Sequence, residues 1–199
     1  MEQVPATRKQ LTHERIVDTA ARVLRETGFS GVGVADIMKR VGLTHGGFYA
    51  HFPSRDALLV EALERAGQDS RARLHKSMDA GEKKAASRFR ALVESYLSDR
   101  HLASAESGCP VAALASEIPR QSDAVREAGA TRVQSLMHAV AATLPEGAPA
   151  ETAGIVASQL VGALQLARGL GDNAKGRRQL AEARRFLLDQ FEPGTSPGH

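Results

Sequence analysis

The chain has 199 residues, of which 42% are hydrophobic, 25% charged and 4% aromatic, and its formal net charge is +3. Its single cysteine, Cys109, cannot form an internal disulfide, which excludes a disulfide-stapled secreted scaffold and favours a reducing, cytoplasmic location. The first residues lack the apolar core of a signal peptide, and no stretch approaches the roughly 20 unbroken apolar residues of a membrane-spanning helix. We therefore expect a soluble protein with no membrane association.

Positive charge is concentrated in the first quarter of the chain. Between Arg8 and Arg55, eight Lys and Arg residues face four Asp and Glu residues, an excess of +4 that exceeds the net charge of the whole chain. A pI near 9.3 is only mildly basic, so the overall charge alone does not indicate nucleic acid. The concentration of positive charge makes the N-terminal region the candidate for contact with a negatively charged partner.

Alanine, leucine, glutamate and arginine dominate, and alternating β-branched runs are missing, so the sequence predicts an all-α fold of about nine helices. Gly28 and Gly42 supply stops after the first two helices, because glycine readily adopts a positive φ. Pro53 ends the third helix, and Ser54 is a good N-cap for a longer fourth one. The expected ranges are 12–27, 34–41, 44–51 and a fourth helix that starts after Ser54.

The remainder of the chain predicts a second helical body. Breaks are expected at Gly81, at 107–110, at Pro119, at 144–149 and at 169–173. The domain boundaries that follow are an N-terminal unit over 1–57, a helical domain over 58–191, and a disordered tail over 192–199. The expected helices are 83–101, 110–117, 122–144, 150–168 and 174–191.

The segment 34–52, VADIMKRVGLTHGGFYAHF, has the spacing of a helix-turn-helix. We expect Ile37, Val41, Leu43 and Phe48 to hold its two helices together, so that the second presents its outer face to a DNA major groove. Thr44 lies at the N-terminus of this second helix, where free amides and the helix dipole favour a phosphate oxygen. The same spacing also fits an ordinary helical corner.

The residues from about 12 to 63, above all LTHGGFYAHFPSRDALL, resemble the DNA-binding domain of the TetR family of bacterial transcriptional regulators. The matching positions are Gly28, Phe29, Val34, Ile37, Gly42, Gly46, Tyr49, His51, Phe52, Ser54 and Leu58. This resemblance implies phosphate contacts for Thr44, Tyr49 and Arg55, and base-facing positions for Gly47 and Ala50. The full set expected at the DNA is Thr44, His45, Gly46, Gly47, Tyr49, Ala50, His51 and Arg55.

The chain departs from the family pattern where bases are read. His45 replaces a common lysine, and Gly47 and Ala50 offer at most backbone approach or an apolar contact to a thymine methyl. His45 and residues of the preceding helix are therefore expected to carry more of the specificity. His51 and Phe52 also have a structural interpretation, because they end the helix beside Pro53.

The second body resembles TetR regulatory domains only loosely. Bundles commonly place small-molecule sites between helices, so part of its apolar surface is expected to line an effector cavity. The few aromatic residues favour a small, mostly apolar or electrophilic effector. The candidate lining residues are Tyr96, Leu114, Met137, Gln159 and Gln165.

The last two helices carry small and apolar residues on more than one face, which predicts cover on both sides. By resemblance to the family, they form the interface of a homodimer. Two-fold symmetry then presents two recognition helices, roughly 34 to 36 Å apart, to a palindromic double-stranded operator.

Cys109 follows Gly108 and precedes Pro110, a favourable first helical residue, so its thiol is expected at a helix N-terminus, where amides stabilise a thiolate. Some TetR-type regulators sense reactive compounds through a cysteine, which makes Cys109 a candidate sensor. The alternative is a buried cysteine that packs as a small hydrophobe.

We find no HExxH motif, paired metal-binding cysteines, phosphate loop or GxSxG elbow, so we expect neither an enzyme nor a metal or cofactor. A pure helical interaction module is a further class, and it predicts no salt-dependent binding to DNA. The sequence favours a DNA-binding repressor that is released from its operator by a small effector or by modification of Cys109. The alternative is an effector-independent or activating regulator with a structural Cys109.

Overall fold

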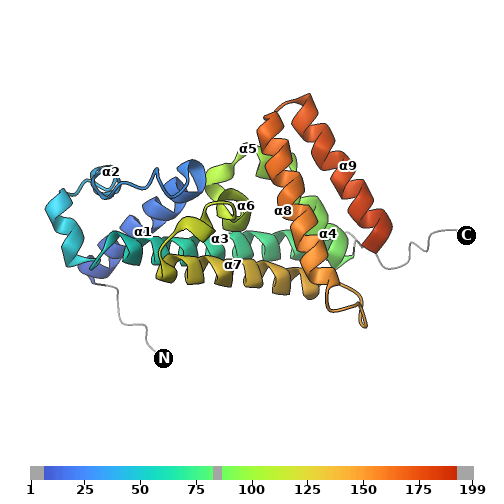
Figure 1. Cartoon of the computed structure of the whole chain (residues 1–199), viewed down its shortest axis with the longest axis horizontal. Helices are drawn as coiled ribbons and strands as arrows, with labels where there is room; N and C mark the ends of the chain where they lie inside the picture. The colour runs from blue at the N-terminus through green and yellow to red at the C-terminus, as the bar shows by residue number, and fades with distance from the viewer. Residues whose placement is uncertain (1–6, 83–86, 192–199) are drawn as a thin grey trace, which may run out of the picture.

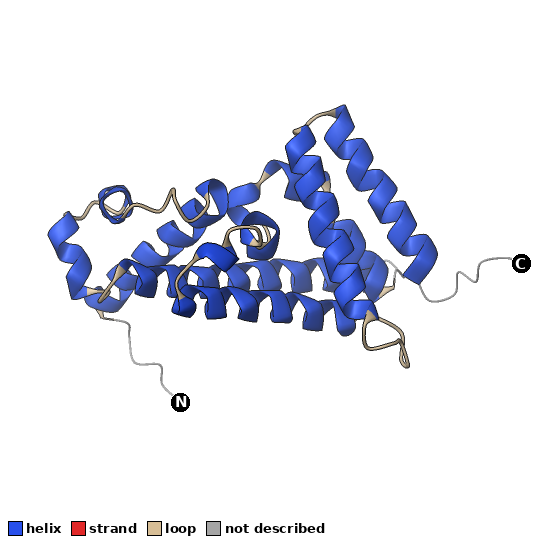
Figure 2. Cartoon of the chain, viewed as in Figure 1, coloured by secondary structure: helices blue, strands red, loops and turns tan. Residues whose placement is uncertain are grey.

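The structure is a computed structural model and describes residues 7–82 and 87–191. Within these ranges it is entirely helical, which confirms the predicted fold class (Figure 2). The predicted tail over 192–199 lies outside the described residues. The α-helices are α1 (Arg8–Thr27), α2 (Val34–Arg40), α3 (Arg55–Glu82), α4 (Arg88–Tyr96), α5 (Asp99–Ala103), α6 (Pro110–Leu114), α7 (Asp123–Ala141), α8 (Thr152–Leu170) and α9 (Ala174–Phe191), and the 3-10 helices are η1 (His45–Ala50), η2 (Ala105–Ser107) and η3 (Ile118–Arg120).

The first helix begins four residues earlier than its apolar stripe predicts, because Thr7 provides a cap. The Thr7 hydroxyl accepts a hydrogen bond from the Gln10 amide at 3.2 Å, and the Thr7 amide donates to the Gln10 side-chain oxygen at 2.7 Å. This reciprocal pair is a capping box. The helix ends as predicted at Gly28, whose φ of +75° few other residues adopt readily.

A first core forms where α1, α2, η1 and the first half of α3 meet, and Leu114, Ile118 and Val125 of the second body also pack in it. Phe29, Phe48 and Phe52 are its largest fully buried side chains. Leu43, expected inside, is exposed, whereas Met38 is fully buried and its methyl group lies close beneath Gly47. The turn at Gly42, also at φ +75°, therefore holds α2 against η1 through Met38 rather than Leu43.

Helix α3 joins the N-terminal unit to the C-terminal body. Its Leu58 and Leu63 lie in the N-terminal core, while Met78 and Leu74, further along the same helix, pack in a second core built mainly from α4 to α9. Figure 1 shows the long α3 and α7 side by side, with α1 and α2 at one end and α8 and α9 at the other. The helix ends at Glu82, one residue beyond the break predicted at Gly81.

Two predicted helices of the second body are wrong in extent. The range 83–101 contains α4 and α5, because the chain leaves the helix at Leu97 and Ser98 caps a new one by accepting a hydrogen bond from the His101 amide at 3.2 Å. Helix α6 ends at Leu114 rather than 117. The break between α4 and α5 lies in the segment that forms the cavity described below.

Helix α8 is long and apolar enough, by length and composition alone, to cross a membrane. A core helix of a soluble protein passes the same test, and α8 buries one face against α7 and α9. Packing therefore explains the apolar residues of one face only, and Ile155, Leu166 and Leu170 remain exposed on α8.

Candidate nucleic-acid interface and effector cavity

The helix-turn-helix presents a continuous exposed surface at the N-terminal end of the molecule. Its second helix is the short 3-10 helix η1, and its Phe48 is buried, whereas Thr44, His45, Gly46 and Ala50 are exposed. Tyr49 is 68% exposed, and its ring stacks on the His45 ring with centroids 6.3 Å apart. The structure therefore brings together most of the residues expected at the DNA.

His51 and Phe52 lie on the inner side of this surface. Phe52 is buried between Phe48 and His13, with ring centroids at 5.4 and 4.5 Å. Burial, followed by the charges of His13 and Lys9, lowers the pKa of His51, whose Nδ1 is buried without a hydrogen-bond partner. This environment favours the structural interpretation of His51 over contact with a base.

Arg55, which was expected to contact a phosphate, donates hydrogen bonds to backbone carbonyl oxygens of its own chain. Its Nε donates to the Val32 carbonyl oxygen at 2.9 Å and its Nη2 donates to the Phe29 carbonyl oxygen. The guanidinium thus ties the first turn of α3 to the loop after α1. These two donors give Arg55 a structural role, and its phosphate contact, which would use the remaining N–H groups, stays a prediction.

The cations nearest the exposed surface lie at the end of α2. Lys39 and Arg40 are both exposed, and the Arg40 Nε donates to Asp36 at 2.7 Å. Arg15 reaches the same place from α1 and donates to the Val41 carbonyl oxygen at 3.1 Å. Lys39 is therefore the cation in this group for which neither an ion pair nor a hydrogen bond is described.

The second body contains a cavity of about 390 Å³ between α3, the segment 95–109 and α7. Of the five residues proposed to line an effector site, only Tyr96 lines it. Leu114 belongs to the N-terminal core, and Met137 and Gln159 are exposed. Gln165 donates to the Ala112 carbonyl oxygen at 3.3 Å. These four residues do not line this cavity, because helical periodicity identifies an apolar face but not which helix covers it.

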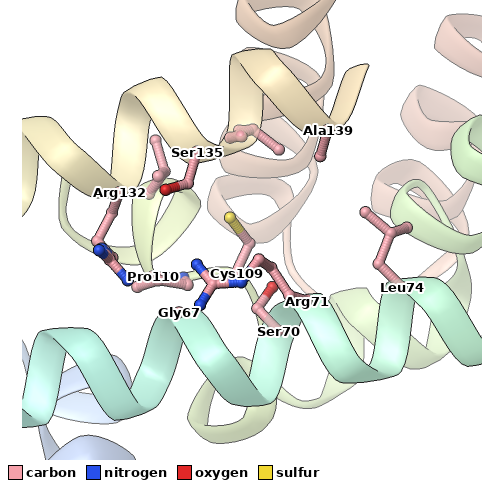
Figure 3. Close-up of a pocket in the computed structure, with 11 residues that line it drawn as sticks. Gly67, Ser70, Arg71, Leu74, Cys109, Pro110, Arg132, Ser135 and Ala139 are labelled. Atoms are coloured by element: carbon pink, nitrogen blue, oxygen red, sulfur yellow. The ribbon is translucent and has the colours of Figure 1, made fainter. Parts of the chain in front are cut away.

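Cys109 is the N-cap of α6 and lines this cavity, with 4% of its surface exposed. It also lines a second, much smaller cavity of about 30 Å³ between α3 and α7, and Figure 3 shows its sulfur pointing into the space between these helices. A space of this size holds about one or two water molecules. The thiol is thus shielded from bulk solvent but reachable through the larger cavity.

His101 fixes the backbone around Cys109. Its Nε2 accepts a hydrogen bond from the Cys109 amide at 2.9 Å, so its Nδ1 carries the proton and donates to the Tyr96 carbonyl oxygen at 2.7 Å. Burial lowers the pKa of His101 to about 4, and the charges of Arg168 and Arg73 act in the same direction. Neither His101 nor the two arginines were singled out from the sequence, because their meeting depends on the break between α4 and α5.

Two side chains connect the cavity wall to the DNA-binding unit. Arg25 of α1, 4% exposed, donates to the Glu106 carbonyl oxygen at 2.7 Å and to the Ala66 carbonyl oxygen and Asp69 at 3.3 Å. Glu117, just beyond α6, accepts a hydrogen bond from the Phe29 amide at 3.0 Å. The segment 105–117 therefore contacts both α1, through Arg25, and the loop that follows α1, through Phe29.

An exposed, core-supported helix-turn-helix beside a larger helical body is the architecture of a DNA-binding regulator. Residues 16–62 match the family described as "Bacterial regulatory proteins, tetR family", and residues 85–183 match "Tetracyclin repressor-like, C-terminal domain". The chain belongs to the TetR family of transcriptional regulators.

Similar proteins are regulators of the same type. An uncharacterized HTH-type transcriptional regulator of Mycobacterium tuberculosis is 30% identical over 116 residues, which are 58% of this chain and 57% of that protein. The HTH-type transcriptional repressor NemR of Escherichia coli is 28% identical over 117 residues, 59% of each chain. The match thus spans somewhat more than half the length of these curated relatives.

Solved structures share the fold over nearly the whole chain. The reduced form of E. coli NemR superposes with a TM-score of 0.75 at 21% identity, covering 93% of this chain and 99% of that one. A TetR-family regulator of Agrobacterium tumefaciens gives a TM-score of 0.73 at 23% identity, covering 92% and 98%. These similarities extend the family fold to the C-terminal body.

Proposed function

We propose that this protein is a cytoplasmic repressor that binds a palindromic operator as a homodimer and leaves it when the cavity around Cys109 is occupied or the thiol is modified. The observation that carries the DNA-binding part is the exposed surface of η1, held in place by the buried Phe48. An exposed tyrosine and histidine on a short helix with a fixed position suit phosphate and base contacts. The proposed domains are 1–57 for DNA and 58–191 for effector binding and dimerisation.

The proposed dimer interface lies on α8 and α9. Four large apolar side chains are exposed there, Ile155, Leu166, Leu170 and Phe186, and the fractions range from 46% to 62%. Exposed apolar groups concentrated on two adjacent helices mark an interaction surface. Both helices lie at the end of the molecule opposite the helix-turn-helix (Figure 1), so a two-fold axis there leaves both η1 surfaces free.

The proposed release mechanism uses the two connections that join the segment 105–117 to α1 and the loop after it. A group added to Cys109, or a ligand beside it, needs space at the start of α6 and displaces the Glu106 carbonyl that Arg25 holds. In an alkylation by a maleimide, the sulfur forms a bond to one alkene carbon and the thiol proton ends on the other. Binding to DNA falls because the modified protein favours a different pose of α1.

DNA binding is tested by selecting duplexes from a random pool and measuring fluorescence anisotropy against salt concentration. Lys39→Gln should lower the salt slope by about 0.9 per phosphate contact, or about 1.8 per dimer. Lys175→Gln removes an equivalent charge at the far end of the molecule and should leave the slope unchanged. Equal slopes for the wild type and both variants would refute a phosphate contact by Lys39.

Base readout is tested on the same duplexes. His45→Ala should cost about 1 to 3 kcal/mol at one operator position and relax the choice of base there. Tyr49→Ala should weaken binding to every duplex to a similar extent, because a phosphate contact carries no sequence information. The same uniform loss in both variants would exclude base reading by His45.

The sensor role is tested with N-ethylmaleimide at neutral pH. Mass spectrometry should show one adduct on the wild type and none on Cys109→Ser, and only the wild type should lose operator affinity. Operator release by the maleimide in Cys109→Ser, or an adduct with no effect on affinity, would favour the structural interpretation of Cys109.

A further inference from the structure

Three positively charged side chains line the larger cavity. Arg73 and Lys76 reach it from α3 and Arg100 from α5, and no Asp or Glu lines it among the residues that the structure describes. Apolar surface is provided by Leu74 and Leu136. The lining also includes Tyr96, His101, Gly108, Cys109 and six serines: Ser70, Ser77, Ser95, Ser98, Ser104 and Ser107. Most of the exposed lining surface is apolar, as expected from the sequence, but the three positively charged side chains were not expected there.

Two buried donors in the wall have no oxygen or nitrogen acceptor within the described protein. Tyr96 is 4% exposed and its hydroxyl lies beside the Cys109 sulfur, which is only a weak acceptor, and the Nη2 of Arg73 is buried and unpaired. Burial, followed by the nearby Cys109 sulfur, raises the pKa of Tyr96 well above its usual value, so the phenol keeps its proton and remains a donor. An unpaired buried donor costs stability, which a suitable acceptor would recover.

We propose that this cavity binds a small organic carboxylate. The carboxylate accepts hydrogen bonds from the Arg73 guanidinium and the Tyr96 hydroxyl, and the apolar part of the ligand lies against Leu74 and Leu136. Lys76 and Arg100, both exposed at the cavity, attract the anion and favour its association. This ligand would be the effector if the proposed function holds, because it would occupy the space beside Cys109 and Ser107.

Other ligand classes fit the lining less well. A neutral apolar molecule would leave both donors buried without an oxygen or nitrogen acceptor, and a cation would meet three positive side chains. The charges of Asp69 and Glu106 act on Arg73, but no hydrogen bond or ion pair between either carboxylate and Arg73 is described, and Asp69 accepts a hydrogen bond from Arg25 at 3.3 Å. The buried Nη2 of Arg73 is therefore available to a carboxylate supplied by a ligand.

The volume limits the ligand to a modest size. A cavity of about 390 Å³ is near the lower end of the 300 to 1,000 Å³ that is usual for small-molecule sites. One or two fused rings, or a short aliphatic chain, match this space. Acetate, benzoate and 1-naphthoate form a graded probe series, and benzamide and 1-naphthamide are neutral counterparts of the last two.

The test is isothermal titration calorimetry on the full chain without DNA. Benzoate or 1-naphthoate should bind at least tenfold more tightly than its amide. Arg73→Met should weaken carboxylate binding about tenfold or more, and Tyr96→Phe several-fold. Arg120→Gln, which removes an exposed arginine of η3 outside the cavity, should leave binding unchanged, and circular dichroism melts of each variant verify that it is folded.

The proposal is overturned if no carboxylate of the series binds, if the acids and amides bind equally, or if Arg73→Met binds as the wild type does. Cys109→Ser should retain carboxylate binding, since the thiol is not one of the two donors. Operator affinity is measured separately by anisotropy with and without the carboxylate. Carboxylate binding by a protein that has no affinity for any duplex would leave this site standing and refute the proposed function.

Discussion

The environment of His101 makes the stability of the protein depend on pH in the range where histidine titrates. Its Nδ1–H donates to the Tyr96 carbonyl oxygen and its Nε2 accepts from the Cys109 amide. A proton added to Nε2 would make it a donor that faces the amide donor of Cys109, so this hydrogen bond would be lost. This geometry agrees with the low pKa of about 4, which burial produces against an ordinary value of 6.5.

The sign and size of the effect follow from proton linkage. Between pH 6.5 and about 4, the unfolded chain holds a proton on His101 that the folded chain lacks, so the free energy of unfolding falls as the pH falls through 6.5 and levels off below 4. The full shift corresponds to about 3 kcal/mol, of which about 2 kcal/mol is lost between pH 7 and pH 5. The contribution of His101 to the free energy of unfolding is therefore greatest above pH 6.5.

The assay is urea unfolding followed by circular dichroism at pH 7 and pH 5. His101→Gln should lose about 2 kcal/mol less than the wild type between these two pH values, because other titrating groups contribute equally to both proteins. His75→Gln, at an exposed position of α3, should follow the wild type. Equal losses in the wild type and His101→Gln, or an imidazole NMR signal of His101 that titrates above pH 6, would refute the reasoning.

Three further substitutions test the contacts that join the parts of the molecule. Arg25→Met should lower the free energy of unfolding by about 1 to 3 kcal/mol in urea titrations and reduce the effect of Cys109 alkylation on operator affinity; the same behaviour in the exposed Arg22→Met would contradict a specific role for Arg25. Arg55→Ala should also lower stability by about 1 to 3 kcal/mol, and an unchanged salt slope would then exclude its phosphate contact, whereas a lower slope with intact stability would contradict its structural role. Phe186→Glu should shift the protein towards monomer in sedimentation velocity, and an unchanged sedimentation coefficient would exclude this face from the interface.

The sequence predicts helix ends well where a single local residue, such as a glycine with positive φ or an N-cap serine, determines the end. Gly28 and Gly42 adopt positive φ, and the Ser54 hydroxyl accepts a hydrogen bond from the Ala57 amide at 3.1 Å, as its N-cap position implies. The start of α1 was missed because the Thr7 capping box lies before the apolar stripe begins. A search for Ser or Thr followed three residues later by Gln or Glu would have found it.

The break between α4 and α5 was harder to predict, because the residues 97 and 98 are not strong helix breakers. Ser98 caps α5 and also donates to the Ser95 carbonyl oxygen at 2.9 Å, so it satisfies backbone groups that the end of one helix and the start of the next leave free. Either continuation of α4 or a break is locally acceptable. Tertiary contacts, above all those of His101, select the break.

Candidate site residues could be predicted where they are consecutive in the sequence, but not where they depend on contacts between distant residues. The exposed helix-turn-helix surface could be predicted because its residues are consecutive in the sequence. Arg55 and Arg25 could not be assigned, because a lone arginine on an amphipathic helix looks the same whether it meets solvent, a phosphate or a distant carbonyl. Arg25 lies 81 residues from Glu106 in the sequence, and only the fold shows that they touch.

The proposed coupling between the cavity and the helix-turn-helix surface rests on backbone carbonyl and amide groups. The Arg25 side chain donates to the carbonyl oxygen of Glu106, and the Glu117 side chain accepts from the amide of Phe29. At positions 29 and 106 the backbone makes the contact, so it does not depend on the side chains there. A displacement of the start of α6 therefore changes these distances whatever residue occupies those positions. A ligand can shift the balance between the two poses only by its difference in affinity for them, and a shift from 1:99 to 99:1 needs about 5.5 kcal/mol. Arg73 and Tyr96, each with a buried donor that lacks an oxygen or nitrogen acceptor in this pose, are the groups through which a bound carboxylate would supply part of that difference.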